Sequence, residues 1–333
     1  MDKVKHILVI RFSSIGDILL TTPVLRSIKA KYGNDCVLHY ATKKEMLKWI
    51  DNNPFVDHFH ALEKGQSVSA FVKSIKSTYH IDAVVDLHNN LRTFIIKLHF
   101  IGVPKSSFPK LNIRKWLYVN FKWDLMPKVH VVDRYFEALR FLGVENDGKG
   151  LDYFLPKEAD DRVSALLKEG QIENYTAITI AAKFATKALP VEKFVELLNY
   201  VQGKVVLLGG PEDGAKAEAI MKRVAYRADI YNFVGLLSPS ESAAMIKHAA
   251  HVIAHDTGLM HVAAAFKKDI VVIWGNTTPA LGMAPYLPSN LKAARYVEVK
   301  NLSCRPCSKI GFNACPKGHF DCMMKQDFAI LSE

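Results

Sequence analysis

Residues 6–20, HILVIRFSSIGDILL, predict the first strand, turn and helix of the fold. The apolar run at the start of this stretch is typical of a buried strand that ends near Phe12, and residues 17–32 have the apolar spacing of a helix. The turn between them holds two serines, a glycine and a carboxylate, Asp17. Turn chemistry accounts for the serines and the glycine, but it does not require an acid where a strand ends.

The same alternation of strand and helix continues along the chain. Apolar runs that fit buried strands occur at residues 36–42, 82–88, 175–182, 204–210, 251–255 and 269–275. Helical patterns separate them, which is typical of parallel sheets covered by helices on both faces. Two such series meet near residues 150–175. The sequence therefore predicts an α/β protein with two Rossmann-like domains whose parallel sheets face each other across a cleft.

Size and composition fit a two-domain globular protein. The chain has 333 residues, of which 49% are hydrophobic and 23% are charged. Its longest apolar runs are too short to span a bilayer. Arg11 interrupts the N-terminal apolar run and no small-residue cleavage site follows it, so we expect no signal peptide and a cytoplasmic location.

The chain carries a formal net charge of +11. Such an excess favours anionic partners, namely nucleic acid, nucleotide substrates or an acidic membrane surface, although it also serves plain solubility. Basic and aromatic residues interleave between Lys97 and Arg140, which suits an anionic amphiphile or a membrane interface. RNA is another ligand of such segments, but no RNA-binding motif accompanies this one.

Two common nucleotide-binding motifs are absent from the sequence. No G-x-G-x-x-G follows the first strand, and no G-x-x-x-x-G-K-[ST] occurs anywhere. These absences count against a dinucleotide-dependent oxidoreductase and against a P-loop NTPase.

Asp17 has two interpretations. Its turn lies at the carboxyl end of a strand and at the N-terminus of a helix, where free backbone N–H groups favour an anion. Asp17 is therefore either a helix cap or dipole partner, or a general base that accepts a proton from a sugar hydroxyl. In the second case we expect the helix end to keep the carboxylate ionised.

A second turn of this kind is DTGLMH, residues 256–261. Asp256 or Thr257 suits the N-cap of the following helix, and Gly258 permits close approach of the backbone to a ligand. Either the helix N–H groups form a cradle for a diphosphate, or the motif is an ordinary capped helix. His261 is the last residue of this motif. Other histidines lie nearby, but no carboxylate or Cys spacing supports a metal site with them.

Three further charged residues follow predicted strands. Lys187 precedes a helix that begins near Pro190, so it either offers a point charge for phosphate or is a solvated loop lysine. Lys183 competes for the same role. Glu212 follows another strand, where an acid either binds the two hydroxyls of a ribose or simply precedes a helix.

Four of the five cysteines cluster near the C-terminus. Cys304, Cys307, Cys315 and Cys322 form C-x2-C-x7-C-x6-C, with His319 inside the motif. In a cytoplasmic protein this clustering suggests a structural zinc site, with free thiols or a disulfide as the alternatives. Four thiolates would leave no open coordination position, so we expect the cluster to be structural.

Taken together, these motifs resemble glycosyltransferase family 9, the ADP-heptose:lipopolysaccharide heptosyltransferases. The resemblance covers nearly the whole chain and rests on the order and spacing of the motifs. They are ILVIRFSSIGDILLTTPVLRSIK (7–29), VVDLHNNLRT (84–93), HVVDRYFEALRFLGV (130–144), HDTGLMHVAAA (255–265) and the Cys cluster with GHFDCM (318–323). The sequence departs from the family pattern at AAKFAT (181–186), where Pro-Gly-Ala-Ser is common, and at Leu189, where a Trp usually precedes the proline.

The resemblance implies a GT-B fold and an inverting transfer without a catalytic metal. Residues 1–160 would bind the acceptor, residues 161–300 would bind the nucleotide sugar, and residues 301–333 would form a Cys-rich segment. Asp17 would be the general base, in a cleft with Ser14, Gly16, Asn89 and Arg92. The donor would contact Lys187, Glu212, Asp256, Thr257, Gly258 and His261. Of these, His261 would either orient the donor sugar or belong to the core. The acceptor would contact Arg114 and Lys115 of the basic aromatic segment.

The implied reaction moves a heptose from ADP-heptose to a lipopolysaccharide inner-core acceptor, either Kdo or heptose on lipid A. We expect it at the inner face of the cytoplasmic membrane, with peripheral attachment, no cofactor for catalysis and no nucleic acid partner. Two alternatives stay open. One is a nucleotide-sugar epimerase of GT-B-like fold, or another nucleotide-sugar-dependent transferase of the same family. The other is a zinc-stapled protein that binds RNA or membranes.

Overall fold

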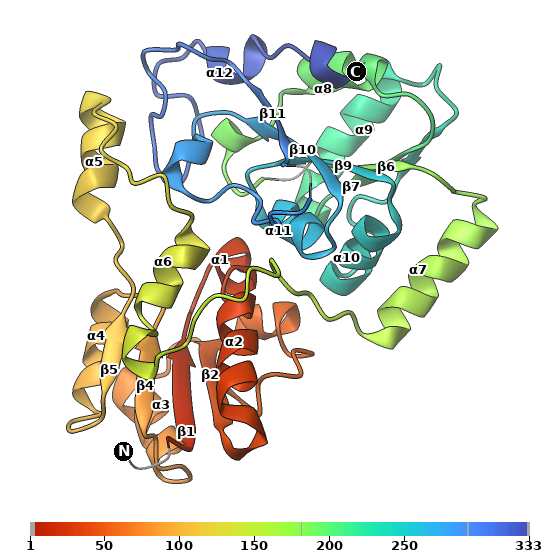
Figure 1. The fold of residues 1–333 in the computed structure, drawn as a ribbon. Coiled ribbons are helices and arrows are strands. Elements are labelled where there is room, and N and C mark those ends of the chain that lie inside the picture. Colours follow the sequence, from red (N-terminus) through yellow and green to blue (C-terminus); the bar gives the residue numbers. More distant parts are fainter. Residues whose placement is uncertain (1–3, 181, 292, 332–333) are drawn as a thin grey trace. The chain divides into compact units, whose positions relative to one another are not determined.

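The computed structural model describes residues 4–180, 182–291 and 293–331 (Figure 1). The chain forms two compact units. Unit 1 comprises Met1–Lys110 and Val129–Phe154, and unit 2 comprises Leu111–Lys128 and Leu155–Glu333. Each unit contains one parallel sheet with helices packed beside it. The prediction of two α/β domains with parallel sheets is therefore confirmed.

Unit 1 is built on a five-stranded sheet with the order β3-β2-β1-β4-β5. Its strands are β1 (His6–Ile10), β2 (Val37–Lys43), β3 (His58–Leu62), β4 (Ala83–Asp86) and β5 (Lys105–Ser107). Its helices are α1 (Ile15–Leu19), α2 (Thr22–Tyr32), α3 (Val68–Lys76), α4 (Leu91–Leu98) and α6 (Val131–Glu137). Ile10 pairs with Ala41 on one side and with Asp86 on the other. The turns that follow β1, β2 and β4 therefore lie together at the carboxyl ends of the strands.

The single helix predicted at residues 17–32 is wrong in one respect, because two helices occupy this stretch. Pro23 stands in the first turn of α2 and has no N–H to donate to the carbonyl of Leu19. The hydroxyl of Thr22 donates to that carbonyl instead, at 2.8 Å, and the hydroxyl of Thr21 donates to the carbonyl of Ile18 at 2.6 Å. These two side-chain hydrogen bonds lie where α1 ends, after one turn and a half, and α2 begins.

The core of unit 1 lies on both faces of β1, whose residues Ile7–Ile10 are all buried. On one face Leu8, Ile10 and Phe12 pack with apolar residues of α3 and α4. Such continuous burial explains why β1 is apolar without alternation, as expected for the centre of a parallel sheet.

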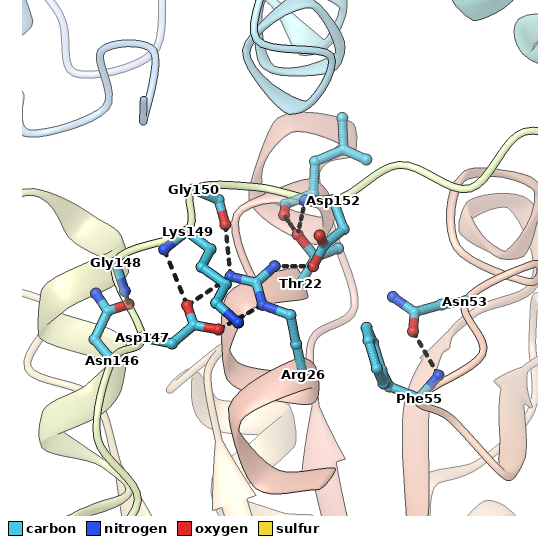
Figure 2. Close-up of polar contacts among 11 residues, drawn as sticks. Thr22, Arg26, Asn53, Phe55, Asn146, Asp147, Gly148, Lys149, Gly150 and Asp152 are labelled. Carbon is cyan, nitrogen blue, oxygen red and sulfur yellow. Dashed lines mark hydrogen bonds and ion pairs between the residues drawn. The ribbon is translucent and has the colours of Figure 1, made fainter. Parts of the chain in front are cut away.

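The chain leaving α6 is tied to α2 by Arg26 (Figure 2). Its guanidinium forms a bidentate ion pair with Asp147, in which both N–O distances are 2.7 Å. It also forms an ion pair with Asp152. It donates to the carbonyl of Gly150 at 2.9 Å, while the hydroxyl of Thr22 accepts from the N–H of Asp152 at 3.0 Å. A planar guanidinium matches these acceptors in a fixed geometry, which holds residues 147–152 against α2.

Unit 2 is built on a six-stranded sheet with the order β11-β10-β9-β6-β7-β8. Its strands are β6 (Thr176–Thr179), β7 (Val205–Leu208), β8 (Ile230–Asn232), β9 (His251–His255), β10 (Asp269–Trp274) and β11 (Arg295–Glu298). Its helices are α5 (Asn112–Phe121), α7 (Lys157–Glu169), α8 (Val191–Tyr200), α9 (Gly214–Arg223), α10 (Pro239–His248), α11 (Gly258–Ala265) and α12 (Asp321–Met324). Among the described residues no helix has both the length and the apolar character needed to cross a membrane.

The C-terminal Cys-rich segment packs into the core of unit 2. Phe328 is fully buried, and Met323 lies in the same apolar cluster as the strands of this unit. The side chain of Gln326 donates to the carbonyl of Trp274 at 2.9 Å. Arg305 donates to the carbonyls of Gly275 and Thr277, at 2.6 and 2.9 Å. These contacts join the segment to the carboxyl end of β10.

Candidate active site

Asp17 lies in the turn that follows β1, at the third position of α1. Its carboxylate is 2.6 Å from the guanidinium of Arg11. The backbone N–H and the hydroxyl of Ser14 both donate to the same carboxylate, at 3.0 and 2.8 Å. Gly16 is buried within the turn. The carboxylate therefore has three donors around it and a fixed direction at the end of the strand.

These partners decide the ionisation of Asp17. Burial acts to raise the pKa of its carboxyl, but the charge of Arg11 and the hydrogen bonds from Ser14 outweigh burial and lower the pKa below its usual range. The group is therefore an anion at neutral pH. The helix end alone was expected to supply this effect, whereas the structure supplies it mainly through Arg11.

The sequence did not indicate that Arg11 is the partner of Asp17. The Arg11 side chain is nearly inaccessible, donates to the carbonyl oxygens of Ser13 and Leu87, and has the rings of Phe108 and Tyr135 about it at 6.0 and 5.8 Å. One signal was present in the sequence, because a charged residue directly after a buried apolar strand needs a partner at that strand end.

The turn after β4 supplies the second group of predicted cleft residues. The buried carboxylate of Asp86 accepts from the backbone N–H groups of His88 and Asn89, at 2.9 and 2.7 Å, and pairs with Lys97 at 2.9 Å. Asn89 has a left-handed backbone conformation, with φ of 49°. Its amide donates to the carbonyl of Phe108 at 2.9 Å, so this side chain holds the neighbouring loop.

A pocket of about 570 Å³ lies at the carboxyl ends of β1 and β4. Its lining includes Phe12 and Ser13 from the first turn and His88, Asn90 and Arg92 from the turn after β4. Burial, followed by the charge of Arg11, lowers the pKa of His88 to about 4. The pocket wall therefore combines a neutral imidazole with the cation of Arg92, which suits a polar or anionic ligand.

Unit 2 brings together two motifs that are far apart in the sequence. The ammonium of Lys187 is 2.6 Å from the carboxylate of Asp256 and donates to the backbone carbonyl of the same residue at 3.1 Å. The hydroxyl of Thr277 donates to the carboxylate as well, at 2.8 Å. Lys183, the competing lysine, instead has its ammonium over the ring of Phe184. Lys187, and not Lys183, thus lies at the start of the DTGLMH motif.

The DTGLMH motif turns from β9 into α11. Thr257 is the N-cap, in an extended conformation, and Gly258 is the first residue of α11. His261 is only 2% exposed, one helical turn further along. The first N–H groups of α11 are available to an anion, whereas the imidazole of His261 lies in the interior.

Glu212 is exposed in the turn that leads into α9, and the neighbouring Asp213 accepts from the N–H of Gly210 at 3.0 Å. Sequence reasoning missed Lys216 in α9, whose ammonium donates to the carbonyl of Ile180 at 3.3 Å. Burial lowers the pKa of Lys216 to about 8. Lys216 thus lies near the carboxyl end of β6. It is a second cation at the end of the sheet where Lys187 also lies.

Arg114 and Lys115 lie on α5, a helix without a buried residue. Arg114 is exposed, and Trp116 and Phe121 of the same helix are exposed by 56% and 52%. At its end the ammonium of Lys122 donates to the carbonyls of Cys304 and Pro306, at 3.2 and 2.7 Å. The helix is therefore attached to the Cys-rich segment through its C-terminus.

The four clustered cysteines are free in the structure, so the disulfide alternative is not formed. The sulfur of Cys304 lies 3.9 Å from a ring nitrogen of His319. Burial raises the pKa of the Cys322 thiol to about 12. Within residues 4–180, 182–291 and 293–331, no group of three or more His, Cys, Asp or Glu side chains is arranged to hold a metal ion. The structure gives the zinc site no support, and zinc binding stays a prediction.

Comparison with known proteins identifies the family of this chain. The model of the family described as glycosyltransferase family 9 (heptosyltransferase) matches residues 68–311. Lipopolysaccharide heptosyltransferase 3 of Escherichia coli K12 is 23% identical over 285 residues, which cover 79% of this chain and 80% of that protein.

Solved structures show the same fold. A glycosyltransferase family 9 protein from Veillonella parvula superposes with a TM-score of 0.77 at 20% identity, covering 99% of this chain and 96% of that one. The E. coli heptosyltransferase WaaC, solved with ADP, gives a TM-score of 0.65 at 19% identity, covering 88% and 93%. This chain therefore belongs to glycosyltransferase family 9 and is a glycosyltransferase of the heptosyltransferase family.

Proposed function

We propose that this enzyme transfers a heptose from ADP-heptose to a lipopolysaccharide inner-core acceptor, Kdo or heptose on lipid A. Asp17 carries the proposal, as an anionic carboxylate fixed at the end of β1 in the unit that holds the 570 Å³ pocket. The names of the relatives support heptose as the transferred sugar, and the ADP in the related WaaC structure supports an adenine nucleotide as the leaving group.

Asp17 is the proposed general base. It accepts the proton of the acceptor hydroxyl while that oxygen attacks the anomeric carbon from the face opposite the nucleotide. The bond from the anomeric carbon to the diphosphate breaks in the same step, so the configuration inverts and ADP leaves. Arg11 and Ser14 hold the carboxylate in place, and the pocket lined by Ser13, Asn90 and Arg92 receives the acceptor sugar.

The donor end of the reaction needs positive charge, because the diphosphate gains negative charge as it leaves. Lys187 and the backbone N–H groups at Thr257 and Gly258 are proposed to stabilise that charge. Lys187 already lies at the start of this motif through its contact with Asp256. Glu212 is proposed to bind the ribose hydroxyls, and His261 supports the donor site from the interior.

The acceptor is anionic and lipid-linked, so the protein must work at a membrane surface. We propose peripheral attachment to the inner face of the cytoplasmic membrane, with Arg114 and Lys115 among the acceptor contacts. Basic side chains near an anionic bilayer each contribute about 1 kcal/mol to such attachment. The reaction needs no cofactor in this scheme.

The test is incubation of the enzyme with ADP-heptose and a delipidated inner-core acceptor, followed by mass spectrometry. A mass gain of one heptose on the acceptor, with release of ADP, supports the proposal. Parallel reactions with UDP- and GDP-sugars test the donor. A changed sugar without any acceptor present would indicate an epimerase, and no product with any acceptor would reject the assignment of the acceptor.

A further inference from the structure

Helix α4 has an apolar side that no described residue of unit 1 covers. The exposed large hydrophobic residues in and just after α4 are Leu91 (75%), Phe94 (54%), Ile95 (38%), Leu98 (56%) and Ile101 (89%). Their spacing of three and four residues puts the helical members of this set on one face. The opposite face packs into the core through Thr93 and Ile96. We name the five exposed residues the α4 stripe.

The stripe lies in a segment without negative charge. The 37 residues from Leu87 to Trp123 contain seven Lys or Arg and no Asp or Glu. Around α4 itself, Arg92 is exposed at the first turn. At the other end the exposed Lys76 donates to the carbonyl of His99 at 2.9 Å, and the exposed Lys105 donates to the carbonyls of Phe100 and Val103 at 2.6 and 3.1 Å. Cations therefore flank the stripe at both ends.

An apolar stripe with cationic ends fits one kind of surface especially well. In an anionic bilayer, apolar side chains enter the boundary of the acyl chains while lysine and arginine heads stay among the phosphates. A second copy of this chain is a poorer occupant, because a symmetric contact through α4 would bring like charges together at both ends.

The stripe is also continuous with the pocket. Leu91 and Ile95 line it together with Phe12 and Ser13 from the end of β1. A lipid that lies along α4 would therefore have its head beside the strand ends, and its sugar would reach the pocket. No part of this path requires a contact outside unit 1.

We propose that the α4 stripe inserts into the surface of an anionic membrane and that a lipid-linked acceptor passes along it into the pocket. The membrane contact stands on the observations above alone. The passage of the acceptor rests on the proposed function.

The test measures vesicle binding without donor or acceptor. The triple variant Phe94→Gln, Leu98→Gln, Ile101→Gln removes three exposed apolar side chains that do not line the pocket, and Gln preserves helix formation in α4. On vesicles of phosphatidylglycerol in phosphatidylcholine, the partition coefficient of the variant should fall by at least about tenfold. The reason is that three apolar side chains, which would be partly buried in the lipid, are replaced by polar ones. Leu236→Gln, at a residue 67% exposed in unit 2, is the matched control and should bind like the wild type.

Further measurements distinguish binding to anionic lipid from association with a second copy of the chain. The wild type should bind pure phosphatidylcholine vesicles more weakly than the anionic ones, and added salt should weaken its binding to the anionic ones. Equal binding of the triple variant and the wild type, with both folded by circular dichroism, overturns the proposal. A wild type that is dimeric without lipid and a triple variant that is monomeric would assign the stripe to a second copy instead.

Turnover tests the passage of the acceptor. The triple variant should match the wild type on a delipidated acceptor and lose activity on the same acceptor embedded in vesicles. Normal activity on the embedded acceptor overturns this part. If no acceptor is used by either protein, the proposed function fails while the vesicle result stands.

Discussion

Arg11 and Asp17 form a 2.6 Å ion pair whose side chains are only 7% and 18% exposed. The pair connects the end of β1 to the first turn of α1 and leaves the carboxylate ionised. Two roles therefore coincide at Asp17, since the same group that is proposed to accept a proton also neutralises a buried cation. Experiments on this residue have to separate catalysis from stability.

Asp17→Asn should reduce kcat by about 10²–10⁴-fold, because the amide keeps the shape but cannot accept the proton. The same change should destabilise the fold by about 3 kcal/mol, since Arg11 then lacks its counterion in a buried site. Steady-state kinetics and urea unfolding on one preparation measure both effects. Turnover near the wild-type value would contradict the role of Asp17 as a base.

The matched control is Asp17→Asn combined with Arg11→Met. Removing the buried charge together with its partner should recover much of the lost stability, because no unpaired ion remains. Activity should stay as low as in the single variant. Recovery of activity along with stability would show that Asp17 acts only through the fold.

The sequence predicted the parts of the fold that depend on local patterns. The strands at the centre of both sheets are continuous apolar runs, and the turns at Asp17 and Asp256 are marked by serine, threonine and glycine next to an acid. Short strands near the sheet edges were missed, namely β3, β5, β8 and β11. β5 is Lys-Ser-Ser and β8 is Ile-Tyr-Asn, and such half-exposed triplets carry no periodic signal.

The candidate site was predictable as motifs but not as contacts. The position of Asp17 at a strand end follows from the strand and the turn. Its pairing with Arg11 depends on how the turn folds back, and that is decided by the hydrogen bonds of Arg11 to Ser13 and Leu87. The pairing of Lys187 with Asp256 spans 69 residues and depends on the order of β6 and β9 in the sheet.

A histidine in unit 1 predicts sensitivity to acid. His39 is fully buried, with its two ring nitrogens 3.0 Å from His6 and 2.9 Å from His60. Burial, and then the neighbouring His60 and His58, lower its pKa to about 3. As pH falls below about 6.5, His39 binds a proton in the unfolded chain but stays neutral in the folded protein. The stability that neutral His39 contributes is complete above that pH and is lost toward pH 3.

The loss due to His39 should reach about 2 kcal/mol at pH 5. Urea unfolding of the wild type and of His39→Gln at pH 7 and pH 5 measures it, because Gln can still donate and accept hydrogen bonds but does not titrate. The variant should lose less stability than the wild type between the two pH values. An equal loss in both proteins would assign the acid sensitivity to other groups.

The basic side chains of α5 should affect the acceptor and not the donor. Replacing Arg114 and Lys115 by Ala should raise the KM for a lipid-linked acceptor and weaken binding to anionic vesicles, with the affinity for ADP unchanged, because only the acceptor side carries the lipid. Lys222→Ala with Arg223→Ala is the matched control, since it removes an adjacent exposed Lys and Arg from the end of α9. An unchanged acceptor KM in the α5 variant counts against the proposed contact.

Zinc at the Cys cluster is testable by elemental analysis. Protein purified without chelators should carry about one equivalent of zinc if Cys304, Cys307, Cys315 and Cys322 bind it as thiolates. Cys304→Ser should then lower the melting temperature more than it lowers turnover, because the cluster belongs to the packing of unit 2. Cys36→Ser, at a cysteine outside the cluster, should leave the zinc content unchanged. Metal-free wild-type protein would identify the cluster as free thiols.

Lys187 and Lys183 offer a direct comparison at the donor site. Lys187→Ala should weaken binding of the nucleotide sugar and slow transfer, because it removes a charge proposed to face the leaving diphosphate. A charge-assisted contact of about 1.5–3 kcal/mol corresponds to a loss of about 10- to 150-fold in kcat/KM. Lys183→Ala should have little effect, since its ammonium lies over Phe184 and not at the DTGLMH motif.

Asp256→Asn, which releases Lys187 from its ion pair, distinguishes a lysine that binds the ligand from one that stabilises the fold. If both Lys187→Ala and Asp256→Asn lower the melting temperature and leave kcat/KM unchanged, Lys187 is structural. If Lys183→Ala shows the kinetic loss instead, the phosphate site lies at the other lysine.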